Sequence, residues 1–222
     1  MAHYQPTDQL DPYEVENQFY LRSHPSRMAK LLAHYELYRQ IVDLPGAIVE
    51  LGVYKGASLM RFASFRQLLE NAYSRMVVGF DAFGSFPSDG VAEATDQAFI
   101  KRFEAAGGDG ISRAGLQDLL DAKGFANTTL VEGNVFDTIP QFLEAHPALK
   151  IALLHLDMDV YEPTAFALDR LLPHMARGGL VVFDDYALLK GATRAADEAC
   201  DRLGVRMEKL SNYVIPAFFR AP

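Results

Sequence analysis

The 222-residue sequence has a single cysteine, no apolar run long enough to cross a membrane and no cluster of basic residues. Because Cys200 has no partner for an internal disulfide, we expect a reducing compartment. A membrane-spanning helix needs roughly 20 consecutive apolar residues, so none is expected. The N-terminus also lacks the basic and apolar regions of a secretion signal. Together these absences predict a cytoplasmic protein.

The charge balance limits the classes of partner that we expect. The formal net charge is −8, from 21 Lys and Arg against 29 Asp and Glu. Nucleic acids and anionic membranes are bound by clustered basic residues, so we expect neither as a partner. The hydrophobic fraction of 50% and the charged fraction of 23% are typical of a soluble globular protein. We expect one α/β domain over residues 1–222, which acts on a small molecule.

Short β-branched runs alternate with segments of helical periodicity, which predicts an α/β fold with a parallel sheet. The aromatic and polar residues 1–26 show no clean period and are interpreted as an arm. Residues 82–124, interrupted by Pro and Gly, are interpreted as a lid-like insertion containing two short helices. The expected strands are 47–51, 76–80, 128–132, 151–156, 180–183 and a hairpin of 206–210 with 213–219 around Ser211-Asn212; the expected helices are 28–42, 58–71, 139–145, 163–175 and 193–203.

Four aspartates follow two of these strands. Asp157 and Asp159 come directly after strand 151–156, and Asp184 and Asp185 come after strand 180–183. The carboxyl ends of parallel strands meet at one edge of a sheet, so we expect the four carboxylates in one crevice. Such a cluster requires a bound cation or a protonated carboxyl, and oxygen ligands favour Mg²⁺ or a similar ion.

Two less specific interpretations also fit the residues at this edge. The aspartates could complement the N-terminus of the following helix, but capping does not explain an adjacent acidic pair at a strand end. His155 lies inside an apolar strand, and is interpreted as a core histidine rather than a ligand.

The segment Glu50-Leu51-Gly52-Val53-Tyr54-Lys55-Gly56 places an acid and two glycines where a strand turns into a helix. Glycine allows a tight turn and close approach of the backbone to a ligand. The segment matches neither G-x-G-x-x-G nor the Walker spacing, so a pyrophosphate ligand is not favoured. Asp81 ends the next strand, where nucleotide-binding units place the acid that receives ribose hydroxyls. A nucleoside-containing cofactor is therefore expected at the same edge.

Five segments within residues 42–196 resemble the macrocin O-methyltransferase family: 48–58, 78–83, 132–136, 156–164 and 178–186. The D-x-D-x-Y-E-P-T and D-D-Y motifs are the most specific parts of this resemblance. It implies an S-adenosylmethionine-dependent, magnesium-dependent enzyme that methylates sugar hydroxyls in natural-product and antibiotic biosynthesis. It also implies the Rossmann-like class I methyltransferase fold, with a mostly parallel seven-stranded sheet, a C-terminal antiparallel hairpin and helices on both faces.

The resemblance further assigns roles to single residues. Asp157, Asp184 and Asp185 would bind the metal, and Asp159 would be the general base. Met158 is a departure, because the family often has glycine between the paired aspartates, and this change would affect the acceptor side. The expected cofactor-binding residues are Glu50, Gly52, Tyr54, Gly56, Ser58, Asp81, Phe83, Gly133, Asn134, Val135, Phe136 and Asp157.

Residue chemistry suggests how such a site would work. Three protein oxygens leave coordination positions open for two vicinal hydroxyls of an acceptor, whose pKa the ion would lower. Two other functions stay open at this point. One is a phosphohydrolase of the haloacid dehalogenase kind, using the D-x-D and D-D aspartates. The other is a non-catalytic homologue that binds the cofactor or a partner, with a homo-oligomer also possible.

Overall fold

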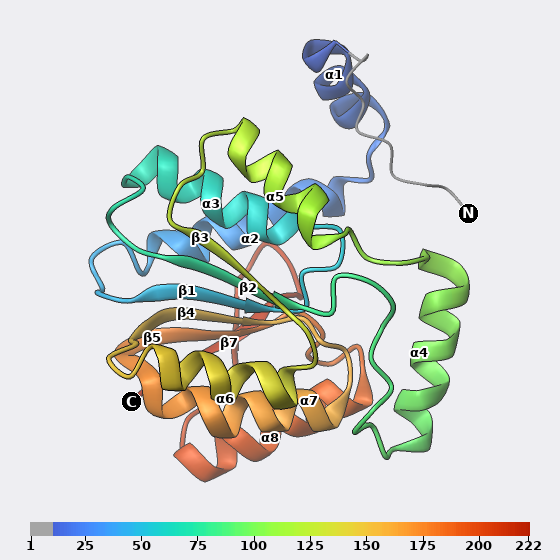
Figure 1. Cartoon of the computed structure of the whole chain (residues 1–222), viewed down its shortest axis with the longest axis vertical. Coiled ribbons are helices and arrows are strands. Elements are labelled where there is room, and N and C mark those ends of the chain that lie inside the picture. The colour runs from blue at the N-terminus through green and yellow to red at the C-terminus, as the bar shows by residue number, and fades with distance from the viewer. Residues whose placement is uncertain (1–10) are drawn as a thin grey trace.

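The computed structural model describes residues 11–222 and contains a seven-stranded sheet in the order β3-β2-β1-β4-β5-β7-β6 (Figure 1). Strands β1 to β5 are parallel, and β7 runs antiparallel to both β5 and β6. The predicted fold class is therefore confirmed. The strands are β1 (Ala47–Leu51), β2 (Val77–Asp81), β3 (Thr128–Glu132), β4 (Ile151–Leu156), β5 (Met175–Phe183), β6 (Glu208–Lys209) and β7 (Ala217–Arg220).

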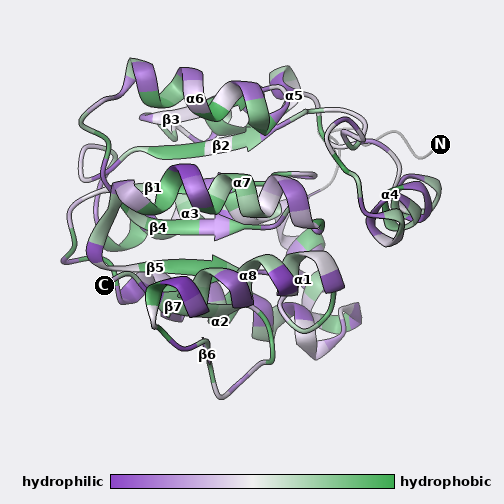
Figure 2. Cartoon of the chain, turned by 90° about the horizontal axis from the view of Figure 1, so that it is seen from below, coloured by the Kyte–Doolittle hydropathy of each residue, from purple (hydrophilic) through white to green (hydrophobic). Residues whose placement is uncertain are grey.

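Helices cover both faces of the sheet. Successive strand residues point to opposite faces, so Ile48 packs with the α2, α3 and α5 side and Val49 packs with the α6, α7 and α8 side. The central strands are buried on both faces, which explains why they are almost wholly apolar (Figure 2). The covering helices are α2 (Pro25–Arg39), α3 (Ala57–Leu69) and α5 (Arg113–Ala122) on one face, and α6 (Val135–Ala145), α7 (Tyr161–Leu171) and α8 (Lys190–Leu203) on the other.

Two helices stand apart from these layers. Helix α1 (Pro12–Arg22) has no buried residue and projects from the body, while α4 (Ala94–Gly107) lies beyond the carboxyl edge of the sheet (Figure 1). The predicted arm thus contains a helix, and its residues 1–10 lie outside the described part of the chain. Within the insertion, α5 joins the core through Leu116 and Leu120, whereas α4 does not. A lid function and the domain bounds stay predictions. Between residues 11 and 222, no helix has the length and apolarity to cross a membrane.

Helix α6 begins at Val135, four residues before the predicted start, and the predicted boundary between α7 and β5 was also wrong. The helix expected at 163–175 ends with α7 and a short 3₁₀ turn, Leu172–His174, and Met175 already begins β5. The Gly178-Gly179 pair does not end a helix. It lies within β5, where Gly178 has φ +80° and a Cβ on Gly179 would meet the Ala176 carbonyl at 2.8 Å. The pair bends the strand, as glycines inside strands commonly do.

The C-terminal hairpin is antiparallel as predicted, but shorter. Glu208 pairs with Phe218 and Lys209 pairs with Ala217, which leaves residues 210–216 as the connection. Ser211 and Asn212 do form a turn. The strands do not reach it because Pro216 has no N–H to contribute to a ladder.

The carboxyl edge of the sheet is held together by direct backbone packing. Gly52, directly after β1, has φ +87°, and a Cβ there would lie 1.8 Å from the carbonyl oxygen of Asp157. Only glycine allows β1 and β4 to approach this closely at the turn. The geometry of the loops after both strands therefore depends on Gly52.

We expect Gly52→Ala to lower the free energy of unfolding by roughly 3 kcal/mol or more, because a left-handed residue and a backbone clash add together. The matched control is Gly204→Ala. Gly204 has φ +66° with nothing within 4 Å of the added Cβ, so that change should cost only about 1 kcal/mol. Urea denaturation of both variants measures the difference, and equal losses would contradict the role given to the Gly52 contact.

Candidate active site

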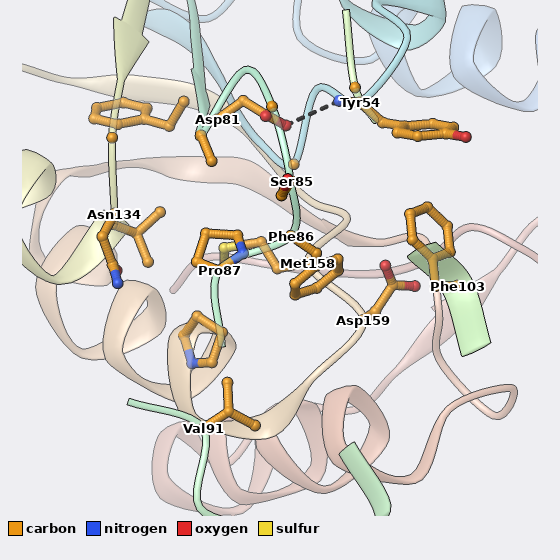
Figure 3. A pocket seen from close by; sticks show the side chains of 18 of the residues that line it. Tyr54, Asp81, Ser85, Phe86, Pro87, Val91, Phe103, Asn134, Met158 and Asp159 are labelled. Carbon is orange, nitrogen blue, oxygen red and sulfur yellow. Dashed lines mark hydrogen bonds between the residues drawn. The ribbon is translucent and has the colours of Figure 1, made fainter. Parts of the chain in front are cut away.

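A cavity opens at the carboxyl ends of the central strands (Figure 3). Its walls come from five segments of the chain: the glycine turn after β1, the loop after β2, the end of α4 with the loop that follows it, the turn before α6 and the loop after β4. The aromatic rings of Phe80, Phe86, Phe103 and Phe136 make much of the lining apolar. Such a cavity suits a ligand with both apolar and polar parts.

Asp81 organises the upper wall of this cavity. Its Oδ2 accepts hydrogen bonds from the backbone N–H groups of Val53 (2.7 Å) and Tyr54 (2.9 Å), and its Oδ1 accepts one from Phe83 (2.6 Å). Figure 3 shows the bond to Tyr54. A carboxylate has about four acceptor positions, so three are used by the backbone. Asp81 therefore fixes the glycine turn against the loop after β2 and has little capacity left for a ligand.

The structure separates the predicted cofactor residues into two groups. Those that do not line the cavity lie behind it: Glu50 and Ser58 are buried, Phe83 is part of the core, and Gly56 precedes α3 against Leu116. Cofactor binding stays a prediction for all of them. The predicted residues that do line the cavity are Gly52, Tyr54, Asp81, Gly133, Asn134, Val135, Phe136 and Asp157.

The acidic residues after β4 and β5 converge as expected. Carboxylate oxygens of Asp157, Asp184 and Asp185 all lie within 4.8 Å of one another. The backbone explains this proximity: Asp157 donates its N–H to the Leu51 carbonyl (2.9 Å), and Asp184 donates to the Leu156 carbonyl (3.0 Å), so the ladders continue past the strand ends. Asp184 Oδ1 and Asp185 Oδ2 are buried and have no hydrogen-bond partner among the described residues. These oxygens fit a hard cation such as Mg²⁺.

Crowding and burial change the acidity of this cluster. Desolvation and the charges of Asp184 and Asp185 raise the pKa of Asp157 well above its usual range. Desolvation and the charges of Asp159 and Asp184 raise the pKa of Asp185 to about 8. Without a cation the cluster retains protons near neutral pH, and a divalent ion would remove the repulsion.

Asp184 is the exception, because Lys30 and two histidines surround it. Lys30 of α2 places its Nζ 2.5 Å from Oδ2, and His155 Nε2 and His34 Nε2 lie 3.6 Å and 3.9 Å from Oδ1. Burial alone would raise the pKa of Asp184, but the two imidazoles and the Lys30 charge hold it well below its usual range. Asp184 is therefore the aspartate of this cluster that is held as an anion.

His155 has more than the core role that its apolar strand predicted. It is fully buried, and its Nδ1 donates to Glu50 Oε1 at 3.0 Å while Nε2 faces Asp184. Burial lowers its basicity, but the two carboxylates outweigh burial and raise the pKa of His155 to about 10. A buried imidazolium thus links Glu50 to Asp184. Glu50 contributes to this link rather than to the cavity wall.

Sequence reasoning missed Lys30, His34 and the polar role of His155. A signal existed for His155: strand residues two apart point the same way, so His155 and Asp157 share an orientation, and Glu50 is its partner in the neighbouring strand. Lys30 and His34 are one helical turn apart on α2. No local pattern shows that this turn faces Asp184, which lies 154 residues away from Lys30.

Asp159 lies between the cavity and the acidic cluster. It has φ +65°, lines the cavity near Phe86 and Phe103 (Figure 3), and is followed by Val160, whose N–H donates to the Met158 carbonyl (2.7 Å). Desolvation and the charge of Asp157 raise the pKa of Asp159 to about 7. A carboxylate with this pKa can accept a proton near neutral pH. Met158, the predicted departure, also lines the cavity.

The insertion holds the turn that carries Asp159. Asp96 of α4 accepts a hydrogen bond from the N–H of Tyr161 (2.8 Å), and Glu162 accepts from the N–H groups of Ala92 (2.9 Å) and Glu93 (3.2 Å). The position of Asp159 therefore depends on residues more than 60 positions earlier in the chain.

Known proteins share this architecture. Residues 25–215 match the macrocin-O-methyltransferase family. A crystal structure of CalS11, described as calicheamicin methyltransferase, superposes with a TM-score of 0.77 and 32% sequence identity over 96% of this chain and 87% of that one. The O-methyltransferase NovP has a TM-score of 0.74 over 86% of this chain and 79% of that one, and at 22% identity it shows the fold alone.

Two curated relatives match over shorter stretches. One is the 8-demethyl-8-(2,3-dimethoxy-alpha-L-rhamnosyl)-tetracenomycin-C 4'-O-methyltransferase of Streptomyces olivaceus, 27% identical over 65% of this chain and 54% of its own length. The other is the demethyldecarbamoylnovobiocin O-methyltransferase of Streptomyces niveus, 29% identical over 70% of this chain and 58% of its own length. The chain thus spans little more than half the length of these relatives. The family match covers most of the chain, and the chain belongs to the macrocin O-methyltransferase family.

Proposed function

We propose that this protein transfers the methyl group of S-adenosylmethionine to a hydroxyl of a sugar or another vicinal-diol acceptor, with the help of a divalent metal ion, in natural-product biosynthesis. One observation carries the proposal: Asp157 and Asp159 lie where the cavity of the glycine turn meets the cluster of Asp157, Asp184 and Asp185. Cofactor, acceptor and ion would therefore meet at one place.

The cavity fits the cofactor in its chemistry. The glycine turn and residues 133–136, at the start of α6, line the ligand space, and the aromatic lining suits an adenosyl group. The three aspartates fit Mg²⁺ because they supply only oxygen ligands. When bound, the cofactor would supply the methyl group and the ion would supply Lewis acidity toward the acceptor hydroxyl.

The residues of the chain then position the acceptor and move its proton. Asp159 would accept the proton of the reacting hydroxyl, since its raised pKa suits a base near neutral pH. Lys30, His155 and Glu50 would hold Asp184 ionised and fixed. Phe86 and Phe103 would exclude water from the space beside Asp159.

Relatives support a sugar as the acceptor. A second CalS11 structure is described as TDP-rhamnose 3'-O-methyltransferase and is 28% identical to this chain, and the tetracenomycin enzyme is named for a rhamnosyl group. Membership of an O-methyltransferase family leaves no reason to retain the phosphohydrolase alternative. Whether the protein is instead a non-catalytic homologue is decided by measuring methyl transfer. Three further points stay predictions from the sequence: neither nucleic acid nor a membrane is expected as a partner, a homo-oligomer is possible, and a cytoplasmic location is expected.

The first test separates binding from chemistry. Calorimetry should detect micromolar binding of S-adenosylhomocysteine to wild type and to Asp159→Asn alike, because the cavity stays intact. Methyl transfer to diol-bearing sugars should require Mg²⁺, stop with EDTA, and fall by at least 100-fold in Asp159→Asn, as expected for loss of a general base. Full activity of a metal-free sample would refute the metal role. Cofactor binding without turnover on any diol acceptor would favour the non-catalytic alternative.

The raised pKa values of the acidic cluster predict how metal binding depends on pH. Protons compete with the ion for Asp185 below its pKa of about 8, so Mg²⁺ affinity should increase as the pH rises through that value and binding should release protons. Titrations in two buffers of different ionisation enthalpy measure the release. Asp185→Asn serves as the comparison, since it should release fewer protons. A metal affinity that is independent of pH would contradict the protonated state of the cluster.

A further inference from the structure

Three buried side chains behind the acidic cluster carry polar atoms without a partner. His34 lies on α2, His155 on β4 and Asp184 directly after β5. Among residues 11–222, no hydrogen bond reaches either ring nitrogen of His34, Nε2 of His155 or Oδ1 of Asp184. A buried polar atom without a partner is costly, because it has given up its hydrogen bonds to water. The three unpaired groups therefore need an explanation.

The unpaired atoms converge. His155 Nε2 lies 3.6 Å and His34 Nε2 lies 3.9 Å from Asp184 Oδ1, and one ligand atom from each of the three residues lies within 4.8 Å of the other two. Distances of this size are too long for hydrogen bonds. They are close to those around a metal ion, since ligands at about 2.0–2.1 Å from a tetrahedral or trigonal zinc ion lie roughly 3.3–3.6 Å apart. The three residues are thus spaced as ligands of one ion.

Packing holds both imidazole rings in place. His34 stacks on Phe62, with ring centroids 5.2 Å apart and an interplanar angle of 19°. His155 lies edge-on to His34 and to Phe62, with centroids 5.2 Å and 5.4 Å away. All three rings are fully buried. Because the rings are already fixed, little conformational freedom would be lost when an ion binds.

Glu50 supplies the outer contact that a metal-bound histidine needs. His155 Nδ1 donates to Glu50 Oε1 at 3.0 Å, which leaves Nε2 to face Asp184. Histidines that bind metals commonly donate their second N–H to a carboxylate, which fixes the tautomer and the ring orientation. The two negative charges of Glu50 and Asp184 also match the charge of one divalent ion, so the ion would not be buried as an uncompensated charge.

The ligand chemistry differs from that of the acidic cluster. Two imidazole nitrogens and one carboxylate oxygen favour Zn²⁺ or another transition ion, whereas Asp157, Asp184 and Asp185 offer only oxygens. Asp184 belongs to both groups. Its Oδ2 contacts Lys30, and its Oδ1 faces the two histidines. Three protein ligands are sufficient for a zinc ion whose fourth ligand is water.

We infer that His34, His155 and Asp184 form a second metal site, selective for Zn²⁺ or a similar transition ion, behind the acidic cluster. The ion would take the place of a proton on His155 Nε2, which is released to solvent. It would join α2 to the ends of β4 and β5, and so hold Asp184 in position within the acidic cluster. The site does not depend on methyl transfer, so it can be tested without the reaction.

The test is an equilibrium titration of Co²⁺ into the metal-stripped full chain with saturating Mg²⁺, followed by the visible absorption of four-coordinate cobalt with nitrogen ligands. We expect about one Co²⁺ per chain, displaced by Zn²⁺ and not by further Mg²⁺. His34→Phe should weaken Co²⁺ binding by roughly 100-fold or more, because it removes a ligand and keeps a ring against Phe62. Glu50→Gln should weaken it by roughly 10- to 100-fold, as expected when a ligating histidine loses its carboxylate partner.

Control variants separate this site from other metal binding. His174→Gln changes a half-buried histidine of the 3₁₀ turn and should leave Co²⁺ binding unchanged. Asp185→Asn should weaken Mg²⁺ binding and keep the cobalt absorption. Metal-free His34→Phe should unfold at the wild-type temperature or above, since it removes two unpaired buried nitrogens. Its loss of Co²⁺ binding then does not come from unfolding.

Three outcomes would overturn the second site. Wild type without cobalt absorption would refute it and leave His155 as a buried imidazolium between Glu50 and Asp184. An absorption that survives His34→Phe but is lost in Asp185→Asn would assign the ion to the acidic cluster. Equal losses in His34→Phe and His174→Gln would show non-specific binding to histidines.

Discussion

The site depends on the cost of burying several carboxylates at the ends of two adjacent strands. Asp157, Asp184 and Asp185 are brought within 4.8 Å by the register of β4 and β5, and without compensation their repulsion would destabilise the fold. The protein compensates in two ways. Lys30 and the buried His155 keep Asp184 ionised, and the other two aspartates have a raised affinity for protons. A divalent ion would replace the protons, so the same strain that disfavours the empty cluster favours metal binding.

The elements around this cluster are coupled through it. Helix α2 is tied to β5 by the ion pair of Lys30 with Asp184, and β1 is tied to β4 by Glu50 with His155. The insertion reaches the turn after β4 through Asp96 and Glu162. Asp159 stands where these contacts meet, at the border between the cavity and the acidic cluster. A change in α2 or α4 can therefore alter the position of the proposed base without touching the ligand.

The two sides of the carboxyl edge of the sheet are held in place by different contacts. The glycine turn and the loop after β2 form part of the cavity proposed for the cofactor, whereas α2 borders the acidic cluster from another side through Lys30. The glycine turn is fixed by the hydrogen bonds that the backbone N–H groups of Val53 and Tyr54 donate to Asp81.

Local patterns in the sequence determined the strands β1 to β4, the end of β5, most helices and the convergence of the four aspartates, because period, glycine turns and the rule for parallel strand ends act over a few residues. They did not determine where α7 ends, since the strand pairing of Met175 with Ile151 outweighs helical spacing. Nor did they show that Lys30 and His34 face Asp184, that Glu50 binds His155, or that Asp96 caps the turn after Asp159. These contacts join residues 65 to 154 positions apart, and only the packing of α2, β1 and α4 against the β4 and β5 ends decides them, because no local energy depends on such distant partners.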